Sequence, residues 1–386
     1  QTLYLSGKAI TSLNFSPLKN NPIYSLSVER AACRSMDLSP LKTCKLKVLS
    51  LKDCGVNSLN FQPLATSPLH KLYVINCPLK KIDVSPLKNT LTELWLGTLQ
   101  NTYFWEEINH KQTKPKYQLL DLSKMKKLKR VYACGVASLK TVKLKDTKTK
   151  QGIRSLLELH LYGTGIRTLD ATAAKNLKRL FVGDRIRKLT VDKCKKLKEI
   201  GVINLGSKQA ATIKSSSVQH IQYQGKTLKK LSFSKCPKLY TLSIKCTKVG
   251  TVNLRSNKRL HYMTLNSKKT GKVVYPKVST KGWHDCCDLV ETNYYKNLDE
   301  FKNDPDAKGV YKEYVGYILE YPTKILDISA WTSLNKTVKR CMFGYGDFDH
   351  EKCATKKIII NKKLRKADKK WIKKFAKKWH VKVVEK

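Results

Sequence analysis

The sequence lacks any long apolar run. No stretch of about 18 consecutive apolar residues occurs, so no segment predicts a membrane-spanning helix. A secretory leader is also missing, because Gln1 and Thr2 lead directly into the apolar spacing of a first strand. We therefore expect that a leader has been removed and that the gene begins upstream of Gln1.

Acidic residues and arginines are scarce. Asp and Glu total 29 against 77 Lys and Arg, which gives a formal net charge of +48, and only 12 of the basic residues are Arg. Base edges in nucleic acids are read mainly by the fixed fork of arginine, so the lysine excess disfavours nucleic acid as a partner. Because 41% of the residues are hydrophobic, too many for a disordered polycation, we expect the chain to fold.

A repeat with the spacing L-x-x-L-x-L organises most of the chain. Copies begin every 20 to 23 residues, except between residues 91 and 156, where one poorer copy and two insertions lie. A second, shorter apolar pattern follows each copy, as in "VNSLNF" (56–61) and "IRTLDA" (166–171), and early copies close with the turn-forming "SPL". Each coil therefore has two extended sides, and neither buries its apolar face unless coils stack.

These residues carry a resemblance to the leucine-rich-repeat family over residues 1 to about 275. Cys54 in "LKVLSLKDCGV" and Cys77 in "LHKLYVINCPL" stand where such repeats carry Asn or Cys. The helix-poor coils with "DLSPL" and "DVSPL" resemble secreted or cell-surface repeat proteins of host-associated bacteria, including the internalins. The resemblance implies a β-rich, helix-poor repeat solenoid, a curved coil stack whose parallel concave sheet recognises a protein or a glycan.

Two columns of side chains are predicted on the concave sheet. The residue between the last two core positions faces that side, as does the residue two places before it. Exposed rings flanked by paired charges are typical of a recognition surface, although stacking of like residues on neighbouring strands would by itself stabilise the coils. The predicted ligand-binding residues are the rings Tyr73, Trp95, Tyr132, His160 and Phe181 and the alternating charges Lys71, Glu93, Arg130, Glu158 and Arg179.

An insertion over 99–117 follows the Trp95 strand and carries Tyr103, Phe104 and Trp105 together. Long loops in repeat proteins cluster where partners bind, so these three residues are predicted to contact the ligand. An aromatic plug that fills an irregular corner between two coils is the alternative interpretation.

The repeat stops near residue 275, so residues 1–275 are predicted to form the solenoid. We expect an irregular insertion over 276–322, and then a late coil with a helical C-terminal cap over 323–386, together a small α+β module. Leu364, Trp371, Phe375 and Trp379 share one helical face near the C-terminus. Such a helix either shields the last coil or lies on an anionic membrane, and the strand pattern "VKVV" after it favours the cap.

Twelve cysteines show no C-x-x-C spacing. Cys54 and Cys77 occupy equivalent interior positions and are expected to be reduced and buried. Four others lie outside the regular coils, near His284 and His350, where disulfides, free thiols, a zinc site or a catalytic thiol are all conceivable. In a secreted protein disulfides are the simplest of these; the four are Cys286, Cys287, Cys341 and Cys353.

The sequence thus predicts a non-catalytic, adhesin-like recognition protein, secreted or at the cell surface, without metal or cofactor. Its partner is predicted to be a protein or a glycan on the concave face. The alternative is a protein held to wall polymers, acidic glycans or nucleic acid by its lysine-rich convex surface.

Overall fold

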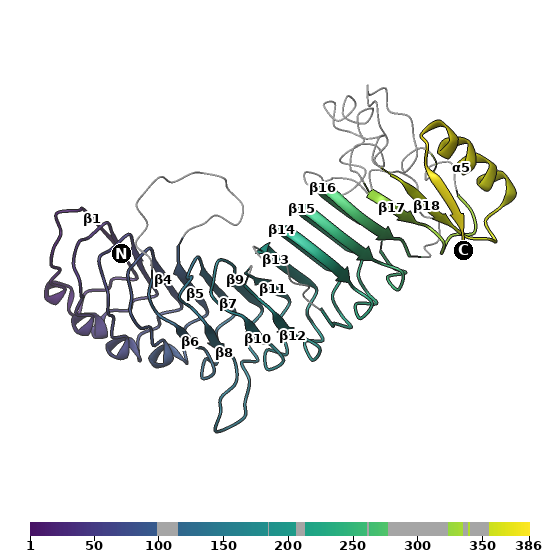
Figure 1. The fold of residues 1–386 in the computed structure, drawn as a ribbon. Helices are drawn as coiled ribbons and strands as arrows, with labels where there is room; N and C mark the ends of the chain where they lie inside the picture. The colour runs from purple at the N-terminus through teal and green to yellow at the C-terminus, as the bar shows by residue number, and fades with distance from the viewer. Residues whose placement is uncertain are drawn as a thin grey trace. The chain divides into compact units, whose positions relative to one another are not determined.

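The computed structural model describes residues 1–98, 115–183, 185–205, 213–260, 262–276, 323–334, 339 and 355–386. Two compact units make up the chain, Gln1–Asn204 and Leu205–Lys386. Both are built from parallel strands, one or two for each turn of the chain, as Figure 1 shows. The predicted repeat solenoid is confirmed, whereas the predicted boundaries near residues 275 and 322 stay predictions.

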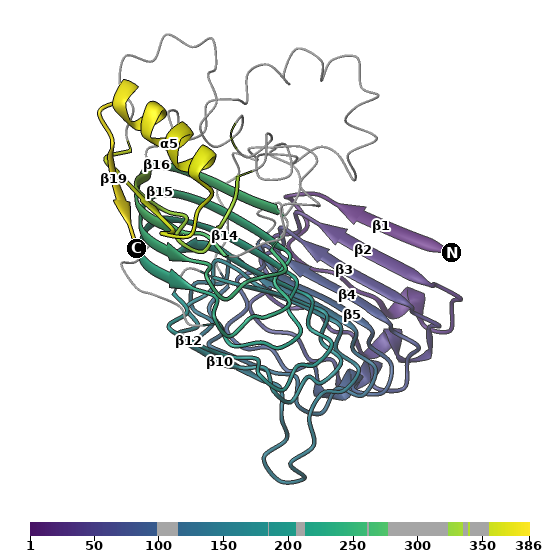
Figure 2. The ribbon, with the colours of Figure 1, turned by 90° about the vertical axis from the view of Figure 1, so that its right-hand side faces the viewer.

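The first unit carries its main sheet on one side of the coils. Adjacent strands pair in parallel and in register, so equivalent residues of successive repeats lie side by side. Figure 2 shows β1 to β5 in this arrangement. The strands, in sheet order, are β1 (Thr2–Ser6), β2 (Ser25–Glu29), β3 (Val48–Lys52), β4 (Lys71–Ile75), β5 (Glu93–Gly97), β7 (Arg130–Cys134), β9 (Glu158–Leu161), β11 (Arg179–Val182) and β13 (Glu199–Leu205).

The leucines of the repeat fill the interior of the coils. Leu49 and Leu51, for example, point inward from β3 and have no exposed surface, while the residue between them points outward. Burial of this kind stabilises by about 25 cal/mol for each Å² of apolar surface, but it requires a neighbouring coil on both sides.

Left-handed residues end several of these strands and turn the chain out of the sheet. Asp53 and Asn76 have φ of 54° and 52°, and Gly135 and Gly163 have φ of 70° and 67°. Asn, Asp and Gly adopt this conformation most readily. The ladder continues through side chains, since Asn76 Nδ2 donates to Asp53 Oδ1 at 2.8 Å.

The opposite corner of each of the first four coils is set by an Asp or Asn side chain. Asp37 Oδ1 accepts the amide of Ser39 at 2.9 Å, and Asp83 Oδ1 accepts the amide of Ser85 at the same distance. Proline then fixes a short 3₁₀ turn, as the "SPL" motif predicted. These turns are η1 (Ser16–Leu18), η2 (Ser39–Thr43), η3 (Gln62–Leu64) and η4 (Ser85–Leu87).

The second extended side forms strands in only part of the first unit. The pairs are β6 (Leu119–Asp121) with β8 (Thr141–Lys143), and β10 (Thr168–Asp170) with β12 (Lys188–Thr190). The pattern "IRTLDA" therefore gives a strand, while "VNSLNF" packs inward without forming one.

The second unit has longer strands. Three of them run for 13 residues each and pair in parallel, β14 (His220–Ser232), β15 (Thr241–Asn253) and β16 (Tyr262–Val274). The sheet continues through β17 (Thr323–Asp327) and β18 (Lys357–Ile360) to β19 (Lys382–Glu385).

The helix α5 (Lys366–Lys378) connects β18 to β19 and lies over them. Its apolar residues Ile372, Phe375 and Ala376 are buried in one core with Leu326 and Ile358 of the strands. The apolar face is thus already covered by the protein, which favours the cap over a membrane-surface helix.

A buried carboxylate fixes the start of this helix. The Asp368 side chain has no exposed surface, and its Oδ2 accepts from Arg365 Nε at 2.8 Å and from the Leu334 amide at 2.9 Å. Burial raises the pKa of this carboxyl, but the bonds from Arg365 and Lys339 outweigh that effect and lower it overall.

The eight cysteines within the described residues, Cys54 and Cys77 among them, are buried and unbridged. Within the same residues no helix is long and apolar enough to cross a membrane.

Candidate recognition surface on the sheet

The sheet register brings the five predicted rings into one column. Tyr73, Trp95, Tyr132, His160 and Phe181 lie on five neighbouring strands, each opposite the next. Ring centroids are 6.0 Å apart for Tyr73 and Trp95 and 3.9 Å for Trp95 and Tyr132. The next two separations are 4.4 Å and 4.6 Å, so the stack is continuous from β4 to β11. We call these five residues the ring column.

Small residues bound the ring column at both ends. On one side Tyr73 lies opposite Ser50 of β3. On the other side Phe181 lies opposite Gly201 of β13, and a Cβ at residue 201 would overlap the Phe181 ring. Glycine at this position is therefore what lets Phe181 fold down onto the sheet.

Glu93 holds the centre of the ring column in place. Its Oε1 accepts from Trp95 Nε1 at 2.7 Å, and its Oε2 accepts from Arg130 at 2.8 Å. Tyr73 donates its hydroxyl to the same carboxylate at 3.4 Å. Burial raises the Glu93 pKa, but the bonds from Arg130 and Trp95 outweigh it, so the pKa lies below its usual value. The carboxylate is therefore charged at neutral pH, and the polar edge of Trp95 is already satisfied.

The rest of the predicted charged column is also paired. Arg179 Nε lies 3.2 Å from Glu199, and Tyr132 donates its hydroxyl to Glu158 at 3.2 Å. Lys71 stands opposite Glu93 and helps lower its pKa. Because Arg179 and Glu158 are already bonded within the sheet, each keeps a bonding partner when a ligand covers it.

His160 is the exception within the ring column. Both of its ring nitrogens are buried without a hydrogen-bond partner among the described residues. Nε2 lies 3.9 Å from Glu158, too far for a hydrogen bond. Burial, reinforced by the Arg179 charge, lowers the His160 pKa to about 4, so the ring is neutral at pH 7.

Exposure divides the ring column into two parts. Tyr73, Trp95 and Tyr132 are half-buried, whereas His160 and Phe181 are each only 7% exposed. The sequence pattern could not separate these two parts, because all five rings occupy the same repeat position. The first three rings therefore supply most of the surface that a partner could touch.

Tyr4 repeats part of the arrangement on the first strand, where sequence reasoning did not place a site. Its hydroxyl donates to Glu29 Oε2 at 2.6 Å. This hydrogen bond lowers the Glu29 pKa most, and the positive charge of Lys52 lowers it further. Tyr4 is 56% exposed. Tyr4 occupies the same repeat position as the rings of the ring column, and this spacing could have identified it from the sequence. Two coils that carry serine at this position, Ser27 and Ser50, separate it from the ring column.

Other predicted site residues fall outside the described residues. These are the loop residues Tyr103, Phe104 and Trp105 and the cysteines Cys286, Cys287, Cys341 and Cys353. Among the residues that are described, no group of three or more His, Cys, Asp and Glu side chains could hold a metal ion.

No protein-family model matches the chain, and no curated protein matches it. The functional domain of InlJ from Listeria monocytogenes, which includes a cysteine ladder, matches 66% of this chain and 62% of its own length, at 16% identity and a TM-score of 0.28. A chain of the Drosophila Toll–Spatzle complex matches 93% of this chain and 57% of its own length, at 13% identity and a TM-score of 0.42. The match to a leucine-rich-repeat protein of Leptospira interrogans covers 98% of this chain and 99% of that protein's chain, at 13% identity and a TM-score of 0.36.

This chain thus spans less than two thirds of the first two structures. Its fold follows from its own repeat and parallel sheet, and it is that of a leucine-rich-repeat solenoid. The resemblance found in the sequence is confirmed at this level.

Proposed function

We propose that this chain is a non-catalytic recognition protein, secreted or at the cell surface, that binds a protein partner on the sheet face of its first unit. The observation that carries the proposal is the partly exposed section of the ring column, Tyr73, Trp95 and Tyr132. Rigid aromatic side chains that are already ordered lose little conformational entropy on binding and dominate the energetics of many protein interfaces.

The geometry of the stack favours a protein over a glycan. Sugars bind aromatic residues face to face, but the faces of Trp95 are covered by Tyr132 at 3.9 Å and by Tyr73 at 6.0 Å. What Trp95 and Tyr132 offer outward is their edges, which suit the apolar side chains of a protein surface. The donor groups of Trp95 and Tyr132 are bonded to Glu93 and Glu158, so neither residue donates to a sugar hydroxyl.

Stacking for stability alone is the competing explanation, and it applies best to the buried half. His160 and Phe181 contribute little surface, so their role is compatible with packing only. The proposal therefore rests on the three partly exposed rings, and variants must be chosen among them.

The test compares Trp95→Ala with Tyr24→Ala on an array of extracellular proteins. Tyr24 is 42% exposed, lies outside the ring column and contacts Lys47, so its removal deletes an aromatic surface of similar kind elsewhere in the same unit. We expect Trp95→Ala to lose the bound proteins while Tyr24→Ala keeps them. Equal capture by both variants would refute the sheet face as the binding surface.

Two measurements keep the result interpretable. Circular dichroism and the urea midpoint must show that Trp95→Ala is folded, with a stability loss of about 1–2 kcal/mol for a half-buried stacked ring. A glycan array probed with the same variants checks the ligand class. Glycan binding that depends on Trp95, with no protein captured, would reassign the surface to a sugar ligand.

A further inference from the structure

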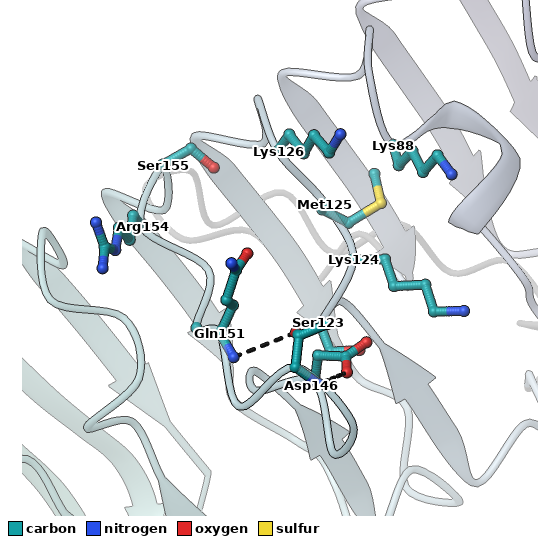
Figure 3. A pocket seen from close by; sticks show the side chains of 11 residues that line it. Lys88, Ser123, Lys124, Met125, Lys126, Asp146, Gln151, Arg154 and Ser155 are labelled. Carbon is teal, nitrogen blue, oxygen red and sulfur yellow. Dashed lines mark hydrogen bonds between the residues drawn. The ribbon is translucent and has the colours of Figure 1, made fainter.

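A pocket opens on the side of the first unit that carries the turns, separate from the ring column. Its volume is about 520 Å³, and residues of three successive coils line it (Figure 3). Lys88 follows η4, Ser123 to Lys126 form the next turn, and residues 146 to 155 belong to the insertion after β8.

The insertion after β8 forms a wall of this pocket and is firmly anchored. Lys145 and Gly152 form an antiparallel bridge, and the Asp146 amide donates to the Gln151 carbonyl at 2.8 Å. Gly152 lies so close to the carbonyl of Ala173 in the next coil that a Cβ would overlap it. The base of the loop is thereby fixed against the solenoid.

The lining carries a strong excess of positive charge. Among the described lining residues, four are cations, Lys88, Lys124, Lys126 and Arg154, and one, Asp146, carries a carboxylate. Figure 3 shows the three lysines together on one side and Arg154 on the other. On the sheet face, by contrast, Arg130 and Arg179 are each paired with a glutamate.

Asp146 offers these cations little compensation, because its carboxylate is used by its own loop. Oδ1 accepts the amides of Lys148 and Thr149, each at 2.8 Å. The hydrogen bond from the Thr149 amide is the largest cause that lowers the Asp146 pKa, and the charge of Lys124 is the smallest. Within the described part of the chain, no carboxylate forms an ion pair with Lys88, Lys126 or Arg154.

A buried hydroxyl in the lining also lacks a partner. Ser155 Oγ is inaccessible to solvent and makes no hydrogen bond to any described residue. In Figure 3 it points toward Lys126. An unsatisfied buried hydroxyl is costly, so rotation of the Ser155 side chain toward an oxygen of a bound ligand would be favoured.

We infer that this pocket binds an oligoanion that carries closely spaced phosphate or sulfate groups. Lysine ammonium groups act as point charges for tetrahedral oxyanions, and three of them from two coils line the pocket together with one hydroxyl donor. None of the described residues that line the pocket is aromatic, so they offer no stacking surface to a nucleobase. The volume accommodates several charged groups rather than a single ion. This site is independent of the ring column and of its protein partner.

The test uses titration calorimetry of the whole chain with two probes, inorganic tripolyphosphate and a heparin-derived hexasaccharide. The site variant Lys88→Gln/Lys124→Gln/Lys126→Gln is compared with Lys19→Gln/Lys42→Gln/Lys45→Gln, which removes the same charge from exposed lysines outside the pocket. We expect the site variant to bind the preferred probe about tenfold more weakly and the control to change by less than about twofold, because only pocket lysines contact the ligand. Preference for one probe identifies phosphate or sulfate as the natural group.

Ser155→Ala provides a second variant that leaves the charge unchanged. It should weaken the preferred probe by about threefold or more, since it removes one hydrogen bond. Equal losses in the site and control variants would show diffuse attraction and overturn the proposal, as would the absence of binding to both probes by the native chain. A thymidine oligomer of equal charge that binds the pocket more tightly than either probe would overturn the assignment to a base-free oligoanion.

Discussion

Acid should weaken the first unit through one residue, His160. Its ring lies buried between Tyr132 and Phe181, with Glu158 at 3.9 Å and the Arg179 charge nearby. The protein holds its pKa at about 4, below the ordinary value of 6.5 that it has in the unfolded chain. Protonation therefore favours the unfolded chain, and the stability is intact above pH 6.5 and lost as the pH falls toward 4.

The size of the effect follows from the two pKa values. A folded pKa of about 4 against 6.5 predicts a loss of about 2 kcal/mol between pH 7 and pH 5, and about 3 kcal/mol in total below pH 4. Most carboxylates with lowered pKa values, such as Glu93, stay charged down to pH 5. The interval from pH 7 to pH 5 therefore avoids the titration of these carboxylates.

The measurement is urea unfolding followed by circular dichroism between pH 5 and pH 7, on the native chain and on His160→Phe. Phenylalanine keeps a ring in the stack but does not titrate, so the variant should gain about 2 kcal/mol relative to the native chain as the pH falls to 5. Tyr132→Phe is the matched control, because the Tyr132 pKa of about 12 is far from this interval. A difference between His160→Phe and the native chain that stays constant with pH would refute the reasoning.

Four other substitutions test the packing of the structure, each by its urea midpoint. Asp368→Asn should cost about 3 kcal/mol, because it breaks a fully buried, charge-assisted set of bonds, and an unchanged midpoint would contradict that network. Gly201→Ala should cost about 1–3 kcal/mol by displacing Phe181, and this cost should disappear in a Phe181→Ala background. Gly97→Ala should cost more than about 2 kcal/mol, because φ is +95° and the new Cβ would overlap a backbone carbonyl. Gly7→Ala, which meets only the Ile10 side chain at 3.5 Å, should stay within about 0.5 kcal/mol.

The register of the ring column could be predicted from the sequence because one spacing fixes it. Once Leu72 and Leu94 are assigned to the interior, Tyr73 and Trp95 must lie opposite each other on the outer face. Burial could not be predicted in this way, since it depends on how each ring tilts. Phe181 folds over Gly201. Only the structure shows that the absent side chain of this glycine leaves room for the ring.

The long strands of the second unit were missed for a local reason. In the first unit Asp53 and Asn76 follow the strand in a left-handed conformation and turn the chain. The equivalent repeat positions in β15 and β16 are Cys246 and Ser267, which stay extended. Apolar spacing is the same in both units, so periodicity alone predicts two separate sides in each. The pocket was missed as well, because Lys88 and Arg154 are 66 positions apart in the sequence and meet only when coils stack.

The alternating charges beside the ring column have a consequence for the evolution of the solenoid. Glu93, Arg130, Glu158 and Arg179 follow one another across β5, β7, β9 and β11. Deleting the coil of β7 would set the buried Glu93 against Glu158, two like charges on adjacent strands, which is destabilising. Deleting the coils of β7 and β9 together would set Glu93 against Arg179 and restore a pair of opposite charges. Along this stretch the solenoid can therefore gain or lose coils in twos far more readily than singly, so its length is constrained by parity.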